Sequence, residues 1–237
     1  MTATVLQARG LTKRFAGVTA LAGVDLDVHE GEILAVVGPN GSGKTTLFNV
    51  VSGFHSATAG TVTFRGAVIS GKRADRINRL GLARTFQQAM AFPTFTVAEN
   101  LELAQLAHRD DPARRRELLG LCGLAGVAEA RAADLPYGLQ RKLGVAVGLA
   151  TGPALMLLDE PAAGLSDTDA EDLAELILAL PGRGVSVACI DHNLPFLLPI
   201  AHRVVVLDAG RKIFDGEPLE ARRSAAVVEA YLGGSDV

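Results

Sequence analysis

The chain has 237 residues, enough to bury a sizeable core in one large domain or in one domain with an insertion. Its 23 Lys and Arg residues against 26 Asp and Glu residues give a formal net charge of −3, which excludes the basic face of a nucleic-acid-binding protein. The longest uncharged run, 143–158, contains Gly152-Pro153 and is shorter than the roughly 20 residues of a membrane-spanning helix.

The N-terminal residues and the two cysteines both indicate the compartment of the protein. Residues 1–15 lack the apolar core of a signal peptide, and Cys122 and Cys189 have a spacing that fits neither a disulfide framework nor a zinc site. We therefore expect a soluble, cytoplasmic protein whose cysteines are packed in the core. The basic cluster Arg114–Arg116 predicts the solvated face of a helix.

The first informative element is a predicted phosphate-binding loop. Residues 33–37 form an apolar, β-branched run that predicts a buried strand, and Gly38 to Thr45 match G-x-x-x-x-G-K-[ST]. The residues after this loop predict a helix, and Gly53 can end it. Glycines allow successive N–H groups to point inward, and the helix N-terminus adds positive potential. By this pattern Lys44 reaches the β- and γ-phosphates, and the Thr45 hydroxyl holds Mg²⁺.

A second buried strand, 154–158, leads into adjacent carboxylates. At the end of a strand in a parallel sheet, Asp159 lies beside the phosphate loop, where it can bind Mg²⁺ directly or through water. Glu160 follows and can orient and deprotonate the attacking water. With Lys44, these residues predict a site that hydrolyses a nucleotide.

A third strand, 184–191, leads to His192. At that strand end an imidazole can hydrogen-bond the γ-phosphate and hold the water in line with Glu160, a role that rests partly on the resemblance below. The remaining histidines have no such context, and we expect them to be structural: His29, His55, His108 and His202.

With these pieces in order, the chain resembles the ATP-binding subunit of an ABC transporter along nearly its whole length. The segments that carry the resemblance are "GPNGSGKTT", "TFQQ", "LPYGLQRK", "LMLLDEP", "AAGLSD" and "IDHN". They take the places of the family's Walker A, Q-loop, signature, Walker B, D-loop and H-loop. The stretches "GLARTFQQ", "YGLQRKL" and "LLDEPAAGL" are similar to ATPases of the branched-chain amino-acid uptake type, and related importers of urea or other amides look much alike.

The resemblance implies an α/β fold, a P-loop NTPase (RecA-like) core with an antiparallel β portion and an inserted helical subdomain. Residues 1–87 and 151–237 form the core and β portion in this single ABC ATPase domain of 1–237, and residues 88–150 form the helical signature subdomain. Separately, the pattern of 203–218 predicts a hairpin that turns at Ala209-Gly210, and 220–233 predicts a last helix.

The resemblance also implies the nucleotide contacts, with ATP as the nucleotide and Mg²⁺ as the metal. Phe15 takes the place of the aromatic residue that stacks on adenine; the alternative is a core aromatic at a strand end. Gln87 takes the Q-loop position, touching Mg²⁺ and moving with the membrane partner, and Gln88 is the neighbouring alternative. The phosphate-loop set is Gly38, Pro39, Asn40, Gly41, Ser42, Gly43, Lys44, Thr45 and Thr46.

The signature segment departs from the family's pattern. Pro136 provides neither a hydroxyl nor an N–H group, and Tyr137 replaces a glycine. In this family two ATPase subunits enclose two ATP molecules, and the resemblance places four residues against the partner's ATP: Pro136, Tyr137, Gly138 and Gln140. We therefore predict a heteromeric pair in which the partner's ATP site is weakened and this chain's own site is the stronger. In the D-loop, Ser166 stands where many members have Asp, which puts its contact across the dimer in doubt.

The leading hypothesis is an ATPase subunit that energises uptake of an amino acid or a similar small polar solute. The implied partners are transmembrane permease subunits, a second ATPase subunit (identical or, as the resemblance favours, different) and indirectly an extracytoplasmic solute-binding protein, with no nucleic acid. The chain is then peripheral to the cytoplasmic face of the inner or plasma membrane. Two alternatives stay open, a soluble ABC protein acting on ribosomes or DNA and a regulatory subunit that hydrolyses poorly.

Overall fold

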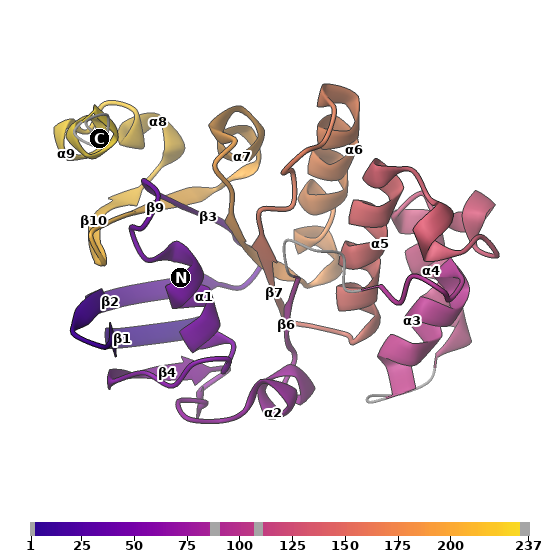
Figure 1. The fold of residues 1–237 in the computed structure, drawn as a ribbon, viewed down its shortest axis with the longest axis horizontal. Coiled ribbons are helices and arrows are strands. Elements are labelled where there is room, and N and C mark those ends of the chain that lie inside the picture. The colour runs from indigo at the N-terminus through magenta and orange to yellow at the C-terminus, as the bar shows by residue number, and fades with distance from the viewer. Residues whose placement is uncertain (1–2, 86–90, 107–110, 233–237) are drawn as a thin grey trace.

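The fold consists of two β-sheets and the helices that cover them (Figure 1). The structure is a computed structural model and describes residues 3–85, 91–106 and 111–232. An antiparallel sheet has the strand order β2-β1-β4-β5, and a larger, mixed sheet has the order β10-β9-β3-β8-β7-β6. The predicted α/β fold class with an antiparallel β portion is thereby confirmed.

The bounds of the elements follow the chain. The strands of the antiparallel sheet are β1 Thr4–Phe15, β2 Val18–His29, β4 Ala59–Phe64 and β5 Ala67–Val68. Those of the mixed sheet are β3 Ile33–Val37, β6 Leu82–Arg84, β7 Leu155–Asp159, β8 Ser186–Ile190, β9 Arg203–Asp208 and β10 Arg211–Gly216. The α-helices are α1 Lys44–Val51, α2 Ala74–Arg79, α3 Val97–Leu106, α4 Pro112–Leu121, α5 Tyr137–Ala150, α6 Asp167–Leu178, α7 Leu194–Ile200, α8 Pro218–Ala221 and α9 Ala225–Leu232.

The strands β9, β3, β8, β7 and β6 of the mixed sheet are parallel, so their carboxyl ends lie at one edge. β10 returns antiparallel to β9 through a turn at Ala209 and Gly210, which both have positive φ, at 43° and 76°. A turn with two such residues suits a tight hairpin. The predicted hairpin is confirmed, and it closes the sheet on the side of β9.

The strand β3 separates two hydrophobic cores. Ile33, Ala35 and Val37 belong to one core, while Leu34 and Val36 belong to the other. All five residues are buried, because helices cover one face of the strand and the antiparallel sheet with α1 covers the other. A continuous apolar run is typical of a strand that is buried on both faces.

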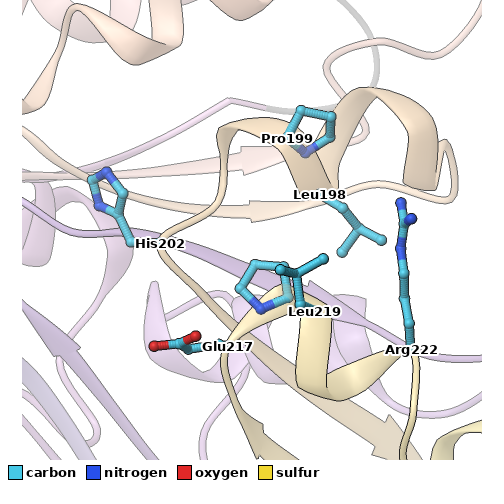
Figure 2. Close-up of a pocket in the computed structure, with 7 residues that line it drawn as sticks. Leu198, Pro199, His202, Glu217, Leu219 and Arg222 are labelled. Atoms are coloured by element: carbon cyan, nitrogen blue, oxygen red, sulfur yellow. The ribbon is translucent and has the colours of Figure 1, made fainter.

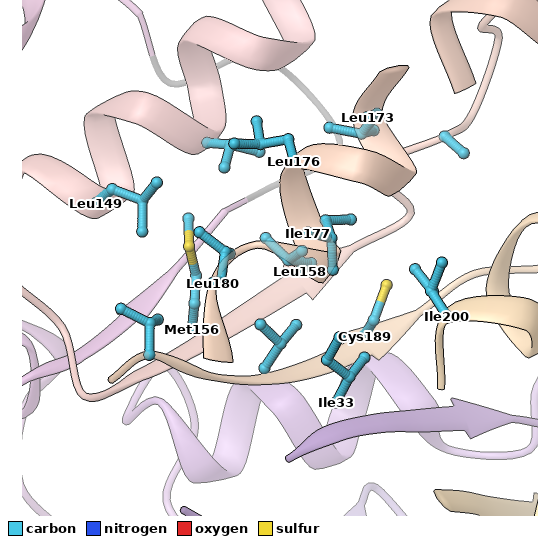
Figure 3. Close-up of a cluster of buried hydrophobic side chains, with 14 of the residues drawn as sticks. Ile33, Leu149, Met156, Leu158, Leu173, Leu176, Ile177, Leu180, Cys189 and Ile200 are labelled. Atoms are coloured by element: carbon cyan, nitrogen blue, oxygen red, sulfur yellow. The ribbon is translucent and has the colours of Figure 1, made fainter. Parts of the chain in front are cut away.

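The larger core lies between the mixed sheet and the helices α5, α6 and α7. Figure 3 shows Leu173 and Ile177 of α6 over Leu158 of β7, with Cys189 of β8 in the same layer. Both cysteines are free and buried, as expected from the sequence, and burial raises the pKa of Cys122 to about 12. Within the described ranges, no helix combines the length and the apolar character needed to cross a membrane.

The helices α3, α4 and α5 gather at the end of the molecule away from the antiparallel sheet (Figure 1). Their starts are set by local polar contacts. Thr96 and Glu99 form a reciprocal capping box at α3, since each side chain accepts a hydrogen bond from the other's backbone N–H. Asp111 caps α4 ahead of Pro112. The division into a core and an inserted subdomain at 88–150 stays a prediction.

The predicted last helix is present as α9, but its predicted start at 220 is wrong, because Glu220 and Ala221 belong to the separate helix α8. Pro218 begins α8, whose residues pack against β9 and β10. Ser224 then accepts a hydrogen bond at its carbonyl from Val228 N, as the residue before a new helix does. Serine is a favoured residue at the start of a helix, so the break between α8 and α9 falls at a residue that suits it.

A comparison of two leucines on α6, Leu173 and Leu178, tests the packing of the core. Leu173 is fully buried, whereas Leu178 on the same helix is 49% exposed. We expect Leu173→Ala to lower the free energy of unfolding by about 2–5 kcal/mol through lost burial and a cavity. Leu178→Ala is expected to change it by less than about 0.5 kcal/mol. Urea denaturation measures both, and equal losses in the two variants contradict this packing.

Candidate active site

The loop between β3 and α1 has the backbone of a phosphate cradle. Gly38, Gly41 and Gly43 have φ values of 149°, 78° and 105°, which side chains rarely tolerate. A Cβ at Gly38 would lie 2.0 Å from the Leu207 carbonyl oxygen, and one at Gly43 would lie 2.5 Å from the Ala20 carbonyl oxygen. The loop is therefore wedged against neighbouring backbone, and its glycines fit a group bound by main-chain N–H donors.

Lys44 is the first residue of α1, and its ammonium is folded over the loop. Its Nζ donates to the carbonyl oxygens of Gly38 at 2.7 Å and Pro39 at 2.9 Å. Burial lowers the pKa of Lys44, and the nearby carboxylates of Glu160 and Asp159 oppose that shift. The carboxylate pair at the end of β7 thus lies close enough to the phosphate loop to act on Lys44, as the sequence predicted.

Asp159, at the carboxyl end of β7, is 6% exposed and forms an ion pair with Arg84. Arg84 Nη2 lies 2.7 Å from Asp159 Oδ2. Sequence reasoning missed Arg84; the only signal was a charged residue at the end of the short apolar run of β6. Thr45, another predicted metal ligand, is exposed at the start of α1.

Glu160 follows β7 with a left-handed backbone, φ 49°, which is uncommon for a residue other than glycine. Its N–H donates to the Ile190 carbonyl at 2.7 Å, so β8 holds this conformation in place. Strained backbone of this kind often occurs at functional sites. His192 Nδ1 lies 3.8 Å from Glu160 Oε2, beyond a direct hydrogen bond, and the His192 side chain is 66% exposed.

Asp191 ties the loops of Glu160 and His192 to each other. Its carboxylate is fully buried and accepts hydrogen bonds from the backbone N–H groups of Ala162 at 3.0 Å and Asn193 at 2.9 Å. Burial raises the pKa of Asp191, although the two N–H donors oppose the shift. One local signal for this role was present, the acidic residue directly before His192.

The signature segment begins α5, with Pro136 at the N-cap position. The Tyr137 hydroxyl donates to the Ala163 carbonyl at 3.1 Å, and Arg141 donates to the same oxygen at 3.0 Å. A Cβ on Gly164 would come within 3.3 Å of the Tyr137 ring. Tyr137 therefore packs on the segment that the resemblance assigns to the D-loop, a link that sequence reasoning did not predict.

Two other predicted signature residues face their own chain. Gly138 is buried, and a Cβ there would lie 2.3 Å from Asp169 Oδ1. Gln140 Nε2 donates to the Leu135 carbonyl at 2.9 Å. Ser166 is the N-cap of α6 and accepts from Asp169 N, which gives the serine in the D-loop a local structural reason. Contact of these residues with a partner's ATP stays a prediction.

Phe15 lies at the end of β1 and is 39% exposed, so the alternative of a core aromatic is wrong. His55 meets its ring edge-on at 5.4 Å between centroids, and Lys13 Nζ lies 4.6 Å from the ring centroid. His55 therefore packs against Phe15, which fits the structural role expected of this histidine. Gln87 and its alternative Gln88 lie outside the described residues, as does His108.

The C-terminal helix α9 also reaches the phosphate loop. Burial raises the pKa of the Tyr231 hydroxyl, and the nearby backbone N–H of Gly38 opposes that shift. A separate pocket of ≈ 340 Å³ lies between α7 and α8 and is lined by residues that include Leu198, His202 and Arg222 (Figure 2). His202 Nδ1 accepts from Ile33 N at 3.1 Å, which fits its expected structural role.

Comparisons with known proteins agree with this geometry. Residues 21–163 match the family described as ABC transporter. The chain belongs to the ABC transporter family, among its ATP-binding subunits. It is 37% identical over 253 residues to the high-affinity branched-chain amino acid transport ATP-binding protein BraF of Pseudomonas aeruginosa, covering 98% of this chain and 99% of BraF.

Solved structures of ABC cassettes share the fold. The ADP conformation of MJ1267, an ATP-binding cassette of an ABC transporter, matches with a TM-score of 0.89 and 28% identity over 98% of this chain and all of that one. The dimeric structure of MJ0796, a bacterial ABC transporter cassette, matches with a TM-score of 0.79 and 25% identity over 90% of this chain and 98% of that one. The chain is therefore an ABC ATPase, and such subunits act together with permease subunits.

Two glycines of the phosphate loop, Gly38 and Gly41, allow a matched test of its packing. Gly38 and Gly41 both have positive φ, but a Cβ meets the Leu207 carbonyl only at Gly38, and open space at Gly41. We expect Gly38→Ala to lower the free energy of unfolding by about 1–3 kcal/mol more than Gly41→Ala, because only the first also forces the loop to shift. Denaturation of both variants measures the difference, and equal stabilities contradict the wedged loop.

Proposed function

We propose that this chain is the ATP-hydrolysing subunit of an importer for branched-chain or other amino acids. The observation that carries the proposal is the similarity to BraF, which extends over nearly the full length of both chains. The cis groups for hydrolysis support it, because Lys44, Asp159, Glu160 and His192 all lie at the carboxyl ends of parallel strands or the helix that follows one. Their presence argues against a regulatory subunit that hydrolyses poorly.

The phosphates of ATP are held, in this proposal, by the loop from Gly38 to Thr46. The N–H groups of the glycine-rich turn and of the first turn of α1 donate to phosphate oxygens. Lys44, now bonded to two loop carbonyls, exchanges those partners for the β- and γ-phosphates. Phe15 offers its partly exposed ring to adenine.

Glu160 is the proposed general base, and His192 the residue that holds the γ-phosphate and the water in line. The backbone bond from Glu160 to Ile190 and the Asp191 clamp keep the two side chains next to each other. The separation of 3.8 Å between Glu160 Oε2 and His192 Nδ1 lets one water hydrogen-bond to both atoms. A positioned base is worth about 10²–10⁴ in rate.

Mg²⁺ is the proposed metal, with Thr45 and Asp159 as its protein ligands. A hydroxyl and one carboxylate suit a metal that usually takes one or two protein carboxylates together with substrate phosphates and waters. When bound, it neutralises the charge that develops on the transferred phosphoryl group. Gln87, outside the described residues, is the further proposed ligand.

The proposed partners are permeases, a second ATPase subunit and, indirectly, an extracytoplasmic solute-binding protein. A groove of ≈ 300 Å³ lies next to β6 and is lined by residues that include Asn78, Phe92, Leu103 and Gly148. Arg84, which also lines the groove, comes shortly before Gln87 in the sequence, so we propose the groove as the permease contact. In this proposal the chain lies on the cytoplasmic face of the membrane. The dimer of MJ0796 supports pairing of two cassettes.

Replacement of Glu160 tests the catalytic assignment. Glu160→Gln keeps the size of the side chain but removes its ability to accept a proton. We expect phosphate release by the transporter reconstituted with its permeases and partner ATPase to fall at least about 100-fold, with ATP binding retained. Glu171→Gln, the same change at an exposed position of α6, serves as the control. Robust hydrolysis by Glu160→Gln would falsify the assignment of the general base.

Replacement of Pro136 tests the proposed asymmetry between the two ATP sites. Pro136→Ser restores a hydroxyl and an N–H at the start of α5, which then face the partner's ATP. We expect ATPase activity of the assembled transporter to rise at least about 3-fold, short of the roughly 100-fold that a full transition-state donor supplies. Pro136→Ala, which restores only the N–H, is the control. An unchanged rate in Pro136→Ser removes support for a weakened partner site.

A further inference from the structure

Arg84, the last residue of β6, carries a guanidinium group into the interior of the molecule. Its side chain is 4% exposed, although arginine is almost never fully buried unless it is paired. In the parallel sheet, Arg84 stands opposite Leu157 of β7 and therefore two residues before the level of Asp159. It also lies directly before the segment that leads to the predicted Q-loop glutamine.

The guanidinium joins the carboxylate strand to the phosphate-loop helix. Nη2 lies 2.7 Å from Asp159 Oδ2. Nη1 donates to Asn49 Oδ1 at 2.7 Å and to Ser52 Oγ at 3.2 Å, both of which belong to α1 or its C-cap. Phe48 adds an aromatic ring whose centroid is 6.0 Å from the guanidinium carbon. One side chain thus bridges β6, α1 and β7.

This arrangement is better explained by orientation than by stability. Burying two opposite charges costs desolvation that their attraction often only offsets, so an apolar pair of similar volume is frequently as stable. A hydrogen bond to one oxygen fixes the rotation of a planar carboxylate, and with it the direction of the other oxygen. Arginine suits this because its planar fork holds Asp159 and Asn49 at once, which a lysine ammonium on a flexible stem does not.

We propose that Arg84 is a positioning residue for the metal site: by holding Asp159 Oδ2 and gripping α1, it sets how the carboxylate is presented to Mg²⁺ beside Thr45. The inference rests on the proposed role of Asp159 as a Mg²⁺ ligand. Partners that orient a metal ligand in this way typically change metal affinity or activity by about 10–100-fold when they are removed.

The test compares ADP affinity of the purified full chain in Mg²⁺ and in EDTA, by titration calorimetry. The ratio of the two affinities is the gain due to the metal. We expect Arg84→Met to lower this ratio about 10-fold or more, with the affinity in EDTA unchanged. Arg84→Lys, which keeps the charge but loses the fork, is expected to give a smaller loss in the same direction. In the assembled transporter, Arg84→Lys is expected to lower kcat at saturating Mg²⁺ with little change in KM for ATP.

A matched control comes from Arg203, a second largely buried arginine of the same sheet. Its Nη1 lies 2.8 Å from Glu32 Oε1 and its Nε lies 2.6 Å from Asp215 Oδ1, away from the phosphate loop. Arg203→Met removes both of these ion pairs and is expected to lower stability without changing the Mg²⁺ ratio. Because Arg84→Met leaves the Asp159 charge buried, Arg84→Lys decides the question if the Met variant does not fold.

The outcomes separate this inference from the proposed function. A Mg²⁺ ratio that is unchanged in Arg84→Met and Arg84→Lys overturns the positioning role and leaves a purely structural ion pair. A ratio that rises also overturns it, because Arg84 then competes with the metal for Asp159. Asp159→Asn is the reference: if it leaves the ratio unchanged, the metal role of Asp159 itself fails. If Asp159→Asn lowers the ratio and both Arg84 variants do not, only the inference about Arg84 fails.

Discussion

The parallel pairing of β3 with its neighbours in the mixed sheet is the constraint on which the rest of the structure depends. Because β3, β7 and β8 run in the same direction and lie side by side, their carboxyl ends meet at one edge. The phosphate loop, the Asp159-Glu160 pair and the Asp191-His192 pair each follow one of these strands. Segments more than a hundred residues apart in the chain therefore form one site, and a hydrophobic core packs against each face of β3.

Buried polar groups then fix the direction of the catalytic side chains. Asp191 joins the loops that carry Glu160 and His192, and Arg84 joins Asp159 to the helix that follows the phosphate loop. Burial costs each of these charges its hydration. Hydrogen bonds and ion pairing compensate that cost, and they form only when the backbone holds the partners in place. The site thus depends on groups that touch neither phosphate nor water in the proposed mechanism.

The signature side of the molecule shows a different balance. Tyr137 and Arg141 both donate to the Ala163 carbonyl, and Gly138 packs against Asp169 at the start of α6. These residues therefore connect the start of α5 to the segment before α6 through hydrogen bonds and close packing. Tyr137, where this chain departs from the family's pattern, thereby links the start of α5 to the D-loop segment of its own chain.

The sequence by itself determined the elements whose signals are local. The glycine spacing of 38–45 specified the phosphate loop, because few other residues tolerate its backbone angles, and the apolar runs specified β3, β7 and β8. It did not specify where one helix ends within 220–233, since Ser224 interrupts a pattern that is otherwise suited to a single helix. Nor did it distinguish an exposed Phe15 from a buried one, because burial depends on what packs against the strand end.

Only the tertiary structure decided which side chains act on one another. Arg84 and Asp159 are 75 positions apart, and Tyr137 and Ala163 are 26 apart, so no local pattern links them. Their contacts arise from the strand order and from the packing of α5 on its neighbours, which depend on the whole core at once. Local residue patterns thus named the chemical groups of the site, and long-range packing set the distances and directions that let those groups work together.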